Sequence, residues 1–476
     1  MIRFRTYLLW LGLIALHTWL FFKHSLGLNA LLFSSVLVML ITWHHGLQKE
    51  KTWWMAVVGH LFISVAVFWH GSDAAIVGYQ FSSLLLAGFV FSVRSSLPIA
   101  LLNGIGGSSL LAFVAWFPVV AEDIKTGSAS MSFMKHLAFR KAYFYVAPIT
   151  VTLIFYFLYS IANPDFFLEF SFPEWEIDTY LIMYVIFGSV IMCPFFFPWG
   201  FKTLEVWDSN KPDVLKRIRI KKRSNTKLGL VGENRQAVTM FGMLNILITL
   251  FLTFNMLQIF IPSLNQSQAN HSEQVHKGFE TLIVSIIAAI LLIMYYFREN
   301  QNFYERKVRL VQLATIWIVL NGTLAFFTCY KNLLYVDAYG LTYKRIWVFL
   351  GIVLTVIGLF FTLSKIKDLK TNWYLVRQNI WVLYFAMSFY VLVDWDRLIT
   401  WYNPNFAQEL DLTYILELGD TKLPYLKELV DNKDPRVKDY EDRIAVLVHA
   451  RNLVPNNWRS RTIDGLWLEE QVSKAD

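Results

Sequence analysis

Twelve apolar stretches, each about 17 to 25 residues long, follow one another along most of this 476-residue chain. An apolar run of about 18 residues or more is long enough to cross the hydrocarbon core of a bilayer as a helix. The stretches lie at 6–22, 26–43, 53–69, 74–93, 97–120, 142–162, 179–200, 238–262, 278–297, 309–329, 346–363 and 377–393. They predict an all-α, polytopic transmembrane helical bundle of 11 or 12 spans over residues 1–400.

Helices are the expected form of these stretches, because backbone polar groups inside lipid must bond within their own segment and the stretches lack the alternation of barrel strands. The composition agrees: 56% of residues are hydrophobic and only 16% are charged, against about 25% charged in soluble domains. The net charge of +8 arises from basic residues in short loops. This is the pattern of membrane-protein loops, so we expect no nucleic-acid partner.

Loop charge predicts the orientation of the second half of the chain. The 201–237 loop holds ten Lys or Arg residues, whereas the preceding loop, 163–178, holds none and carries five acids. Basic loops stay in the cytoplasm. We therefore expect a multi-pass membrane protein with 201–237 in the cytoplasm and 163–178 outside.

The 97–120 segment allows two interpretations. If it enters and leaves on the same side, nine basic residues of the N-terminal half lie inside and only Lys23 lies outside, as loop charge prefers. Its glycine-rich run, 103–109, could break a helix where protein covers the backbone. Alternatively the segment is an ordinary helix, in which Gly104, Ser108 and Ala112 form a small-residue face that lets another helix approach closely.

Residues 401–476 are predicted to form a soluble helical tail. This segment carries ten basic and fourteen acidic residues, and its apolar residues recur at helical spacing. The repeating apolar positions are Leu412, Ile415 and Leu416, then Leu423, Leu426 and Leu429, and then Ile444, Val446 and Leu447. We expect three or four short helices, on the extracytoplasmic side by the parity of the spans.

Several segments resemble a bacterial membrane family described as a domain of unknown function (the 4153/4173 type). The matching segments are Ala162–Phe166, His276–Leu282, Leu334–Arg345, Trp401–Asn403, Leu410–Leu416 and Leu423–Leu426. The most specific element is Tyr-Gly-Leu-Thr…Arg, from Tyr339 to Arg345 within Leu334–Arg345, and together the segments cover roughly residues 140 to 460. The resemblance implies a polytopic inner-membrane protein and supplies no catalytic residue, metal or cofactor.

The most specific of these segments also holds a candidate functional group in the loop after the tenth span, predicted outside. Its members are Tyr335, Asp337, Tyr339, Gly340, Thr342 and Arg345. Gly340 could supply a turn with positive φ, and Arg345 could pair with Asp337 or bind an anionic ligand. A structural turn joining two spans explains the same residues.

Two further groups contain ionisable side chains. His276 and Glu280 lie four residues apart, so on a helix they share a face and could bind a divalent metal or relay protons; the alternative is a polar loop with Glu280 near a helix start. Asp394 and Asp396 at the outer end of the last span could attract cations. A solvated, self-paired cluster anchored by neighbouring tryptophans is the alternative.

The remaining polar residues at membrane depth are mostly amides and histidines, which commonly join helices. They are His17, His60, Asn103, Asn245, Asn255, Gln258 and Asn321. No nucleophile–base pair is visible among them, so we expect no enzyme. The sequence favours a membrane scaffold or sensor that acts through partners, docking through the tail or the basic 201–237 loop. The alternative is a transporter or a lipid- or small-molecule-handling permease with a site between helices.

Overall fold

A computed structural model describes residues 2–109, 152, 155–156, 178–217, 229–260, 285–408, 411–452 and 457–474. Within these ranges the chain is helical and has no β-strand; Val214 and Lys370 form one isolated bridge. The predicted all-α bundle is therefore confirmed. Eight helices of the described part are long and apolar enough to cross a membrane.

The chain divides into two compact units, and each is described here by itself. Unit 1 comprises Met1–Ser209, Ser388–Val393 and Ala450–Asp476. Unit 2 comprises Asn210–Met387 and Asp394–His449. The boundary at residue 400 between membrane domain and tail stays a prediction.

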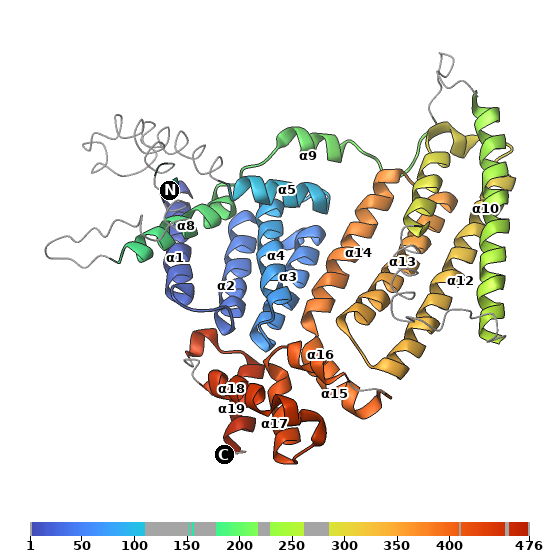
Figure 1. Ribbon diagram of the computed structural model, residues 1–476. Helices are drawn as coiled ribbons and strands as arrows, with labels where there is room; N and C mark the ends of the chain where they lie inside the picture. The colour runs from blue at the N-terminus through green and yellow to red at the C-terminus, as the bar shows by residue number, and fades with distance from the viewer. Residues whose placement is uncertain are drawn as a thin grey trace. The chain divides into compact units, whose positions relative to one another are not determined.

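The described part of unit 1 is built from helices, of which the first four lie side by side (Figure 1). They are α1 (Ile2–Phe21), α2 (Leu28–His45), α3 (Lys51–Trp69), α4 (Asp73–Phe91), α5 (Leu97–Gly107), α8 (Thr179–Phe196) and α9 (Lys202–Ser209). Each of α2 to α5 packs against the helix before it, and α8 packs against α1 and α4. Helix α8 ends at Phe196, two residues before Pro198, and holds Pro194 inside its last turn.

The helices α4 and α5 approach each other more closely than side chains would allow. A Cβ atom on Gly88 would lie 1.6 Å from the carbonyl oxygen of Ala100, and one on Gly104 would lie 1.8 Å from that of Leu84. Glycine is needed at both positions because backbone meets backbone there. The predicted close packing is thus confirmed at Gly104. Beyond residue 109 the 97–120 segment lies outside the described residues, so whether it crosses fully stays open.

Unit 2 contains the longer helices. They are α10 (Gly229–Phe260), a helix over Ser285–Tyr296, α12 (Val308–Tyr339), α13 (Tyr343–Lys367) and α14 (Asn372–Leu392), whose last turn groups with unit 1. Phe241, Ile286, Trp317 and Leu359 belong to an apolar core that the first four of these helices share. The amide of Asn245 on α10 donates to the carbonyl oxygen of Leu313 on α12 at 3.0 Å, which confirms that this intramembrane amide joins two helices.

Most predicted spans coincide with a helix. The 142–162 span falls almost entirely outside the described residues, and the 278–297 span is described from residue 285. Helix α12 extends ten residues beyond the predicted end at residue 329. The predicted end was wrong because it followed hydropathy alone, although no glycine or proline lies between residue 329 and Gly340.

Short helices follow α14, as predicted for the tail. In unit 2 these are α15 (Trp395–Phe406), α16 (Leu412–Glu417), α17 (Leu423–Asp431) and α18 (Glu441–Asn452), and in unit 1 α19 (Ile463–Lys474). Ile415, Leu426 and Ile444 lie in one buried apolar cluster. Val446, in contrast, is 66% exposed. This repeating apolar position therefore lies off the buried face that carries Ile444.

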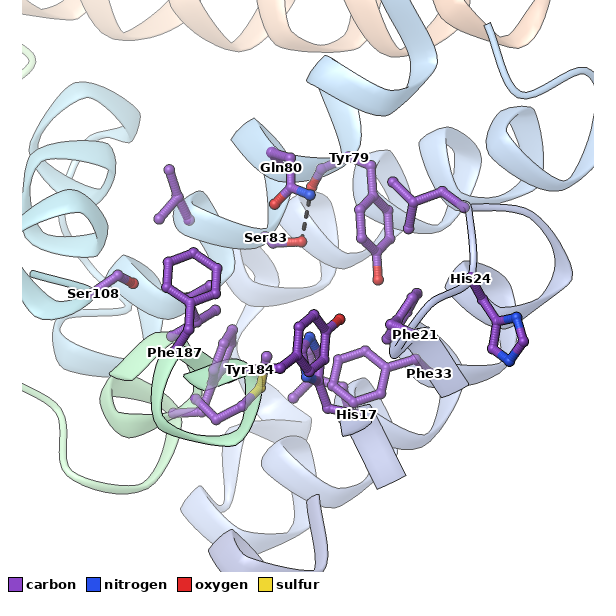
Figure 2. A pocket seen from close by; sticks show the side chains of 16 residues that line it. His17, Phe21, His24, Phe33, Tyr79, Gln80, Ser83, Ser108, Tyr184 and Phe187 are labelled. Atoms are coloured by element: carbon purple, nitrogen blue, oxygen red, sulfur yellow. Dashed lines mark hydrogen bonds between the residues drawn. The ribbon is translucent and has the colours of Figure 1, made fainter. Parts of the chain in front are cut away.

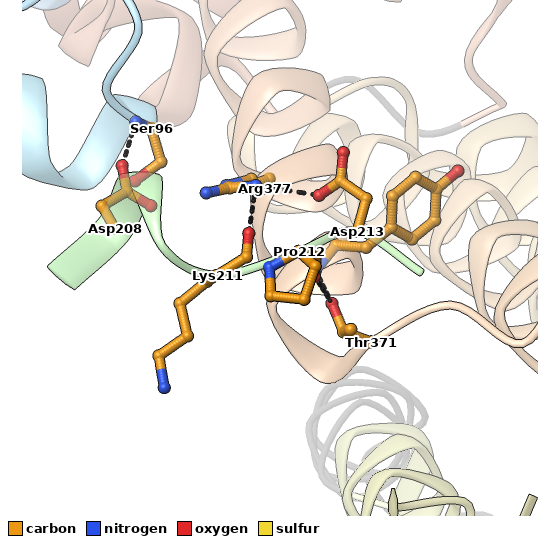
Figure 3. A network of polar contacts seen from close by, with 8 residues as sticks. Ser96, Asp208, Lys211, Pro212, Asp213, Thr371 and Arg377 are labelled. Carbon is orange, nitrogen blue, oxygen red and sulfur yellow. Dashed lines mark hydrogen bonds and ion pairs between the residues drawn. The ribbon is translucent and has the colours of Figure 1, made fainter. Parts of the chain in front are cut away.

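Polar contacts hold Asp208 in unit 1, and Pro212 and Asp213 in unit 2, all within the first part of the 201–237 loop (Figure 3). In unit 1, the buried carboxylate of Asp208 on α9 accepts a hydrogen bond from the backbone N–H of Ser96. In unit 2, Arg377 forms an ion pair with Asp213 at 2.8 Å, and the Thr371 hydroxyl donates to the carbonyl oxygen of Pro212 at 2.8 Å. The most basic stretch of the loop lies mainly outside the described residues, so its docking role stays a prediction.

Candidate functional site

The turn between α12 and α13 is closed by Gly340 and Arg345. Gly340 ends α12 with φ +77°, the left-handed conformation that glycine adopts without strain. The Thr342 hydroxyl caps α13 by accepting from the backbone N–H of Arg345 at 3.5 Å. The Arg345 guanidinium turns back, donates to the carbonyl oxygens of Tyr339 and Gly340, and lies 5.0 Å from the ring centroid of Tyr335. These contacts satisfy the carbonyls at the end of α12.

Asp337 and Arg345 do not form the ion pair that the sequence suggested as one role of Arg345. Asp337 lies on α12, and its carboxylate accepts a hydrogen bond from the Gln408 side chain at 3.1 Å. The backbone N–H of Gln408 also donates to the Asp337 carbonyl oxygen at 3.4 Å. Tyr335, Asp337 and Tyr339 therefore belong to the last turns of a helix rather than to a loop, since α12 continues to Tyr339.

Helix α15 packs directly against this turn through Asn403. The Asn403 amide accepts from the backbone N–H of Leu341 at 2.6 Å and donates to the Leu341 carbonyl oxygen at 3.0 Å. A Cβ atom on Gly340 would lie only 2.7 Å from the Asn403 Oδ1. The segments Leu334–Arg345 and Trp401–Asn403 thus meet in space, and their contacts favour the structural interpretation of the turn.

The two acids at the start of α15 have different roles. Asp394 caps the helix, with its carboxylate accepting from the backbone N–H of Arg397 at 3.1 Å. Asp396 is half-buried and accepts from the Tyr343 hydroxyl at 2.8 Å. Burial raises the pKa of the Asp396 carboxyl, and the hydrogen bond from Tyr343 opposes that shift. The expectation of a fully solvated cluster was wrong for Asp396, because the tail helices cover it.

Replacing Asp396 with Asn is expected to remove a pH-dependent loss of stability. The folded state raises the pKa of this carboxyl. The stability that the protonated carboxyl contributes is therefore fully present below the unfolded pKa of about 3.9, and it is lost as the pH rises through the folded pKa. The amide oxygen of Asp396→Asn can still accept from Tyr343. The melting temperature of the variant should therefore match the parent near pH 4 and exceed it at pH 8.

The control is Asp431→Asn, which removes an exposed acid at the end of α17 in the same unit. The difference in melting temperature between Asp431→Asn and the parent should stay the same from pH 4 to pH 8. A difference for Asp396→Asn that stays constant from pH 4 to pH 8 would contradict the assignment.

His276 and Glu280, the candidate metal or proton-relay pair, lie outside the described residues. Within the described residues no group of three or more His, Cys, Asp or Glu side chains could hold a metal ion. The expectation that the chain has no metal or cofactor stays a prediction.

A pocket of about 500 Å³ lies among α1, α2, α4 and α8 of unit 1 (Figure 2). Its walls are mainly aromatic and aliphatic, with polar side chains at intervals. The lining polar and aromatic residues are His17, Phe21, His24, Phe33, Tyr79, Gln80, Ser83, Ser108, Tyr184, Phe187 and Phe195. Pockets of roughly 300–1,000 Å³ with apolar walls and a few convergent polar groups are typical of small-molecule sites.

One wall of the pocket is an aromatic stack. The imidazole of His17 stacks on the ring of Tyr184, with centroids 5.3 Å apart and planes 14° from parallel. A Cβ atom on Gly188, one turn further along α8, would lie 3.0 Å from the His17 Nδ1. That nitrogen is buried and has no hydrogen-bond partner among the described residues. A buried imidazole nitrogen without a partner is costly, and here it packs against the backbone of α8 at Gly188.

His60, in contrast, is fully satisfied within the helix bundle. Its Nδ1 lies 2.8 Å from the Ser82 hydroxyl and its Nε2 lies 3.0 Å from that of Ser34, and all three residues are completely buried. The Ser34 hydroxyl also donates to the Tyr79 hydroxyl at 3.3 Å. This network joins α2, α3 and α4, so His60 has the helix-joining role. It also holds the Tyr79 ring, which lines the pocket.

His17 was predicted from the sequence as a polar residue at membrane depth, but the pocket was not predicted. Its lining residues come from four helices separated by up to about 180 positions, and no local motif connects them. In the sequence, the signal for a lined interior was the presence of His17, Phe21 and Tyr184 in the predicted spans. This content of aromatic and histidine residues is high for a lipid-facing helix. That signal could suggest a lined interior but not which helices share it.

The fold defines a multi-pass integral membrane protein built of helices. The chain belongs to the family described as "Domain of unknown function (DUF4153)", which matches residues 6–429. The match begins well before the resembling segments and confirms the suspected family. Comparisons with the curated proteins and with the solved structures find no match.

Proposed function

We propose that this protein is a non-enzymatic membrane component that binds an amphipathic small molecule or a lipid chain in the unit 1 pocket. The observation that carries the proposal is the pocket itself, which combines drug-sized volume with aromatic walls and a few polar groups. The proposal takes the lipid- or small-molecule-handling alternative in preference to the scaffold favoured by the sequence.

The chemistry of the walls supports an amphipathic ligand. Phe21, Phe33 and Phe187 offer apolar contact, while the Gln80 and Ser83 side chains offer polar contact. Apolar surface buried against aromatic walls gives affinity, and a few polar groups fix orientation. We place the protein in the inner membrane, as the family resemblance implies, with the α1–α2 loop outside, as loop charge prefers when 97–120 enters and leaves on the same side.

Filling the pocket should abolish ligand binding. Ser83 lines the pocket, and its hydroxyl donates to the Tyr79 carbonyl oxygen of its own helix at 2.8 Å. The indole introduced by Ser83→Trp should occupy the space. Purified protein in phosphatidylcholine nanodiscs would be photolabelled with a diazirine-bearing dodecanol, and the labelled residues mapped by mass spectrometry. Labelling of pocket residues should fall at least tenfold, while labelling of lipid-facing residues stays constant.

The matched control is Ser35→Trp. Ser35 lies exposed on α2 and makes the same intrahelical bond, to the Leu31 carbonyl oxygen at 2.8 Å. This variant should label as the parent does. If the parent is labelled only on lipid-facing residues, or if Ser83→Trp leaves the labelling of pocket residues unchanged, the pocket proposal is wrong.

The scaffold or sensor proposal would then take precedence. One observation favours it: α16, α17 and α18 of the tail enclose an apolar core of their own, which includes Ile415, Leu426 and Ile444. Such a folded layer could present a docking surface to a protein partner.

A further inference from the structure

The short segment before α19 is fastened to the α1–α2 loop of unit 1. The backbone N–H of Leu28 donates to the Arg461 carbonyl oxygen at 2.9 Å. A Cβ atom on Gly27 would lie 2.5 Å from the Ser460 carbonyl oxygen, so the two backbones touch. This segment is therefore held in one place beside the loop that carries the pocket residues His24 and Leu26.

The fastened segment brings a cation to the pocket. The Arg459 Nη1 lies 2.7 Å from the Nε2 of His24, which lines the pocket. The guanidinium also lies 4.8 Å from the ring centroid of Trp19 and 5.6 Å from that of Trp458. Guanidinium groups stack on aromatic rings in this way and remain free to bind an oxyanion with their other N–H groups.

Arg459 has no carboxylate partner among the described residues, and its Nε is buried without any hydrogen-bond partner. The other cation of the loop is already neutralised: Lys23 forms an ion pair with Asp178 at 2.8 Å, which lowers the pKa of the Asp178 carboxyl. A partly buried guanidinium without a carboxylate partner favours an anionic group bound beside it.

We propose that the pocket ligand is an amphiphile with an oxyanion headgroup, a carboxylate or a phosphate, which binds at Arg459 and His24. This inference rests on the proposed function of the pocket. The apolar part of the ligand lies along Phe21, Phe33 and Tyr184, and the charged part lies at the loop end, where Trp19 and Trp458 are of the type found at membrane–water interfaces. Arg459 thereby makes the pocket prefer ligands with an anionic headgroup over ligands with a neutral one.

The test compares two probes with the same chain. Dodecyl phosphate and dodecanol would compete with the diazirine-bearing dodecanol for labelling of pocket residues, on full-length protein in phosphatidylcholine nanodiscs. The parent should bind dodecyl phosphate about tenfold or more tightly than dodecanol, as expected when a hydrogen-bonded charge pair is gained. Arg459→Gln should bring this ratio close to one and leave dodecanol affinity unchanged, which also shows that the variant is folded.

Lys23→Gln is the matched control, because it removes a cation of the same loop that already has a carboxylate partner; its ratio should stay at the parent value. Equal affinity of the parent for both probes, or an unchanged ratio in Arg459→Gln, overturns the headgroup assignment while the pocket remains a binding site. Failure of both probes to compete overturns the proposed function instead. Displacement of the label by inorganic phosphate alone would show a simple anion site and overturn the amphiphile assignment.

Discussion

Gly88→Ala is expected to prevent normal folding of unit 1 or to destabilise it by more than about 3 kcal/mol. The new methyl group would lie 1.6 Å from the Ala100 carbonyl oxygen and 2.8 Å from the Gly104 backbone nitrogen. Both neighbours are backbone atoms, so no side chain can rotate away and α4 must separate from α5. The measurement is the yield and melting temperature of the detergent-purified protein.

Gly12→Ala provides the control in the same unit. Gly12 lies on α1, and a Cβ atom there would meet nothing within 4 Å. Alanine is favoured over glycine in a helix by about 1 kcal/mol, so this variant should be as stable as the parent or slightly more stable. A glycine-to-alanine substitution is thus expected to lower stability at position 88 and to leave it unchanged or raise it at position 12.

The cause can be tested by combining Gly88→Ala with Gly104→Ala, whose methyl group would lie 1.8 Å from the Leu84 carbonyl oxygen. Both substitutions separate the same two helices. The double variant should therefore lose less stability than the sum of the single variants. Additive losses, or a normal melting temperature of Gly88→Ala, would show that α4 and α5 do not approach closely in the membrane.

Arg345→Ala is expected to lower the melting temperature by several degrees, corresponding to roughly 3 kcal/mol. Arg345 is 9% exposed and donates to the carbonyl oxygens of Tyr339 and Gly340. Its removal leaves these carbonyls without their donor at the end of α12, which costs about 1–3 kcal/mol for each group left unsatisfied. Arg345→Lys should rescue the loss only in part, because a single ammonium lacks the fork of donors that a guanidinium has.

Arg306→Ala is the comparison for this experiment. Arg306 is an exposed residue in the segment before α12, and removing exposed charges usually changes stability by less than about 0.5 kcal/mol. Equal melting temperatures of Arg345→Ala and Arg306→Ala would mean that the α12–α13 turn does not depend on the guanidinium. A normal melting temperature of Arg345→Ala with lost function would instead favour a ligand-binding role for Arg345.

Much of the architecture was predictable from hydropathy and helix-terminating residues. Apolar runs of membrane length identified α2, α3, α4 and α8 within a few residues, because the backbone in lipid must bond within its own segment. Hydropathy failed at the end of α12, where helical structure continues through polar residues to a glycine. Helix ends depend on capping and on glycine as well as on membrane thickness.

The candidate sites were predicted less completely. The residues of the α12–α13 turn were identified as a group, yet the partner of Asp337 proved to be Gln408, 71 residues away. The burial of Asp396 likewise follows from packing of the tail, since Tyr343 and Gly419 approach it from distant parts of the chain. A sequence pattern indicates which side chains share a helix face, but not which residues of another element that face contacts.

The sequence by itself determined the class of this protein, its helical spans, the turn at Gly340 and the small-residue face at Gly104, because each depends on local backbone geometry or on the transfer of contiguous residues into lipid. Only the tertiary structure decided that Gly88 lies opposite that face, that His17 stacks on Tyr184 in a pocket and that Arg459 contacts His24. These features arise where residues far apart in the sequence are brought together by packing, and the free energy of such contacts depends on both partners at once.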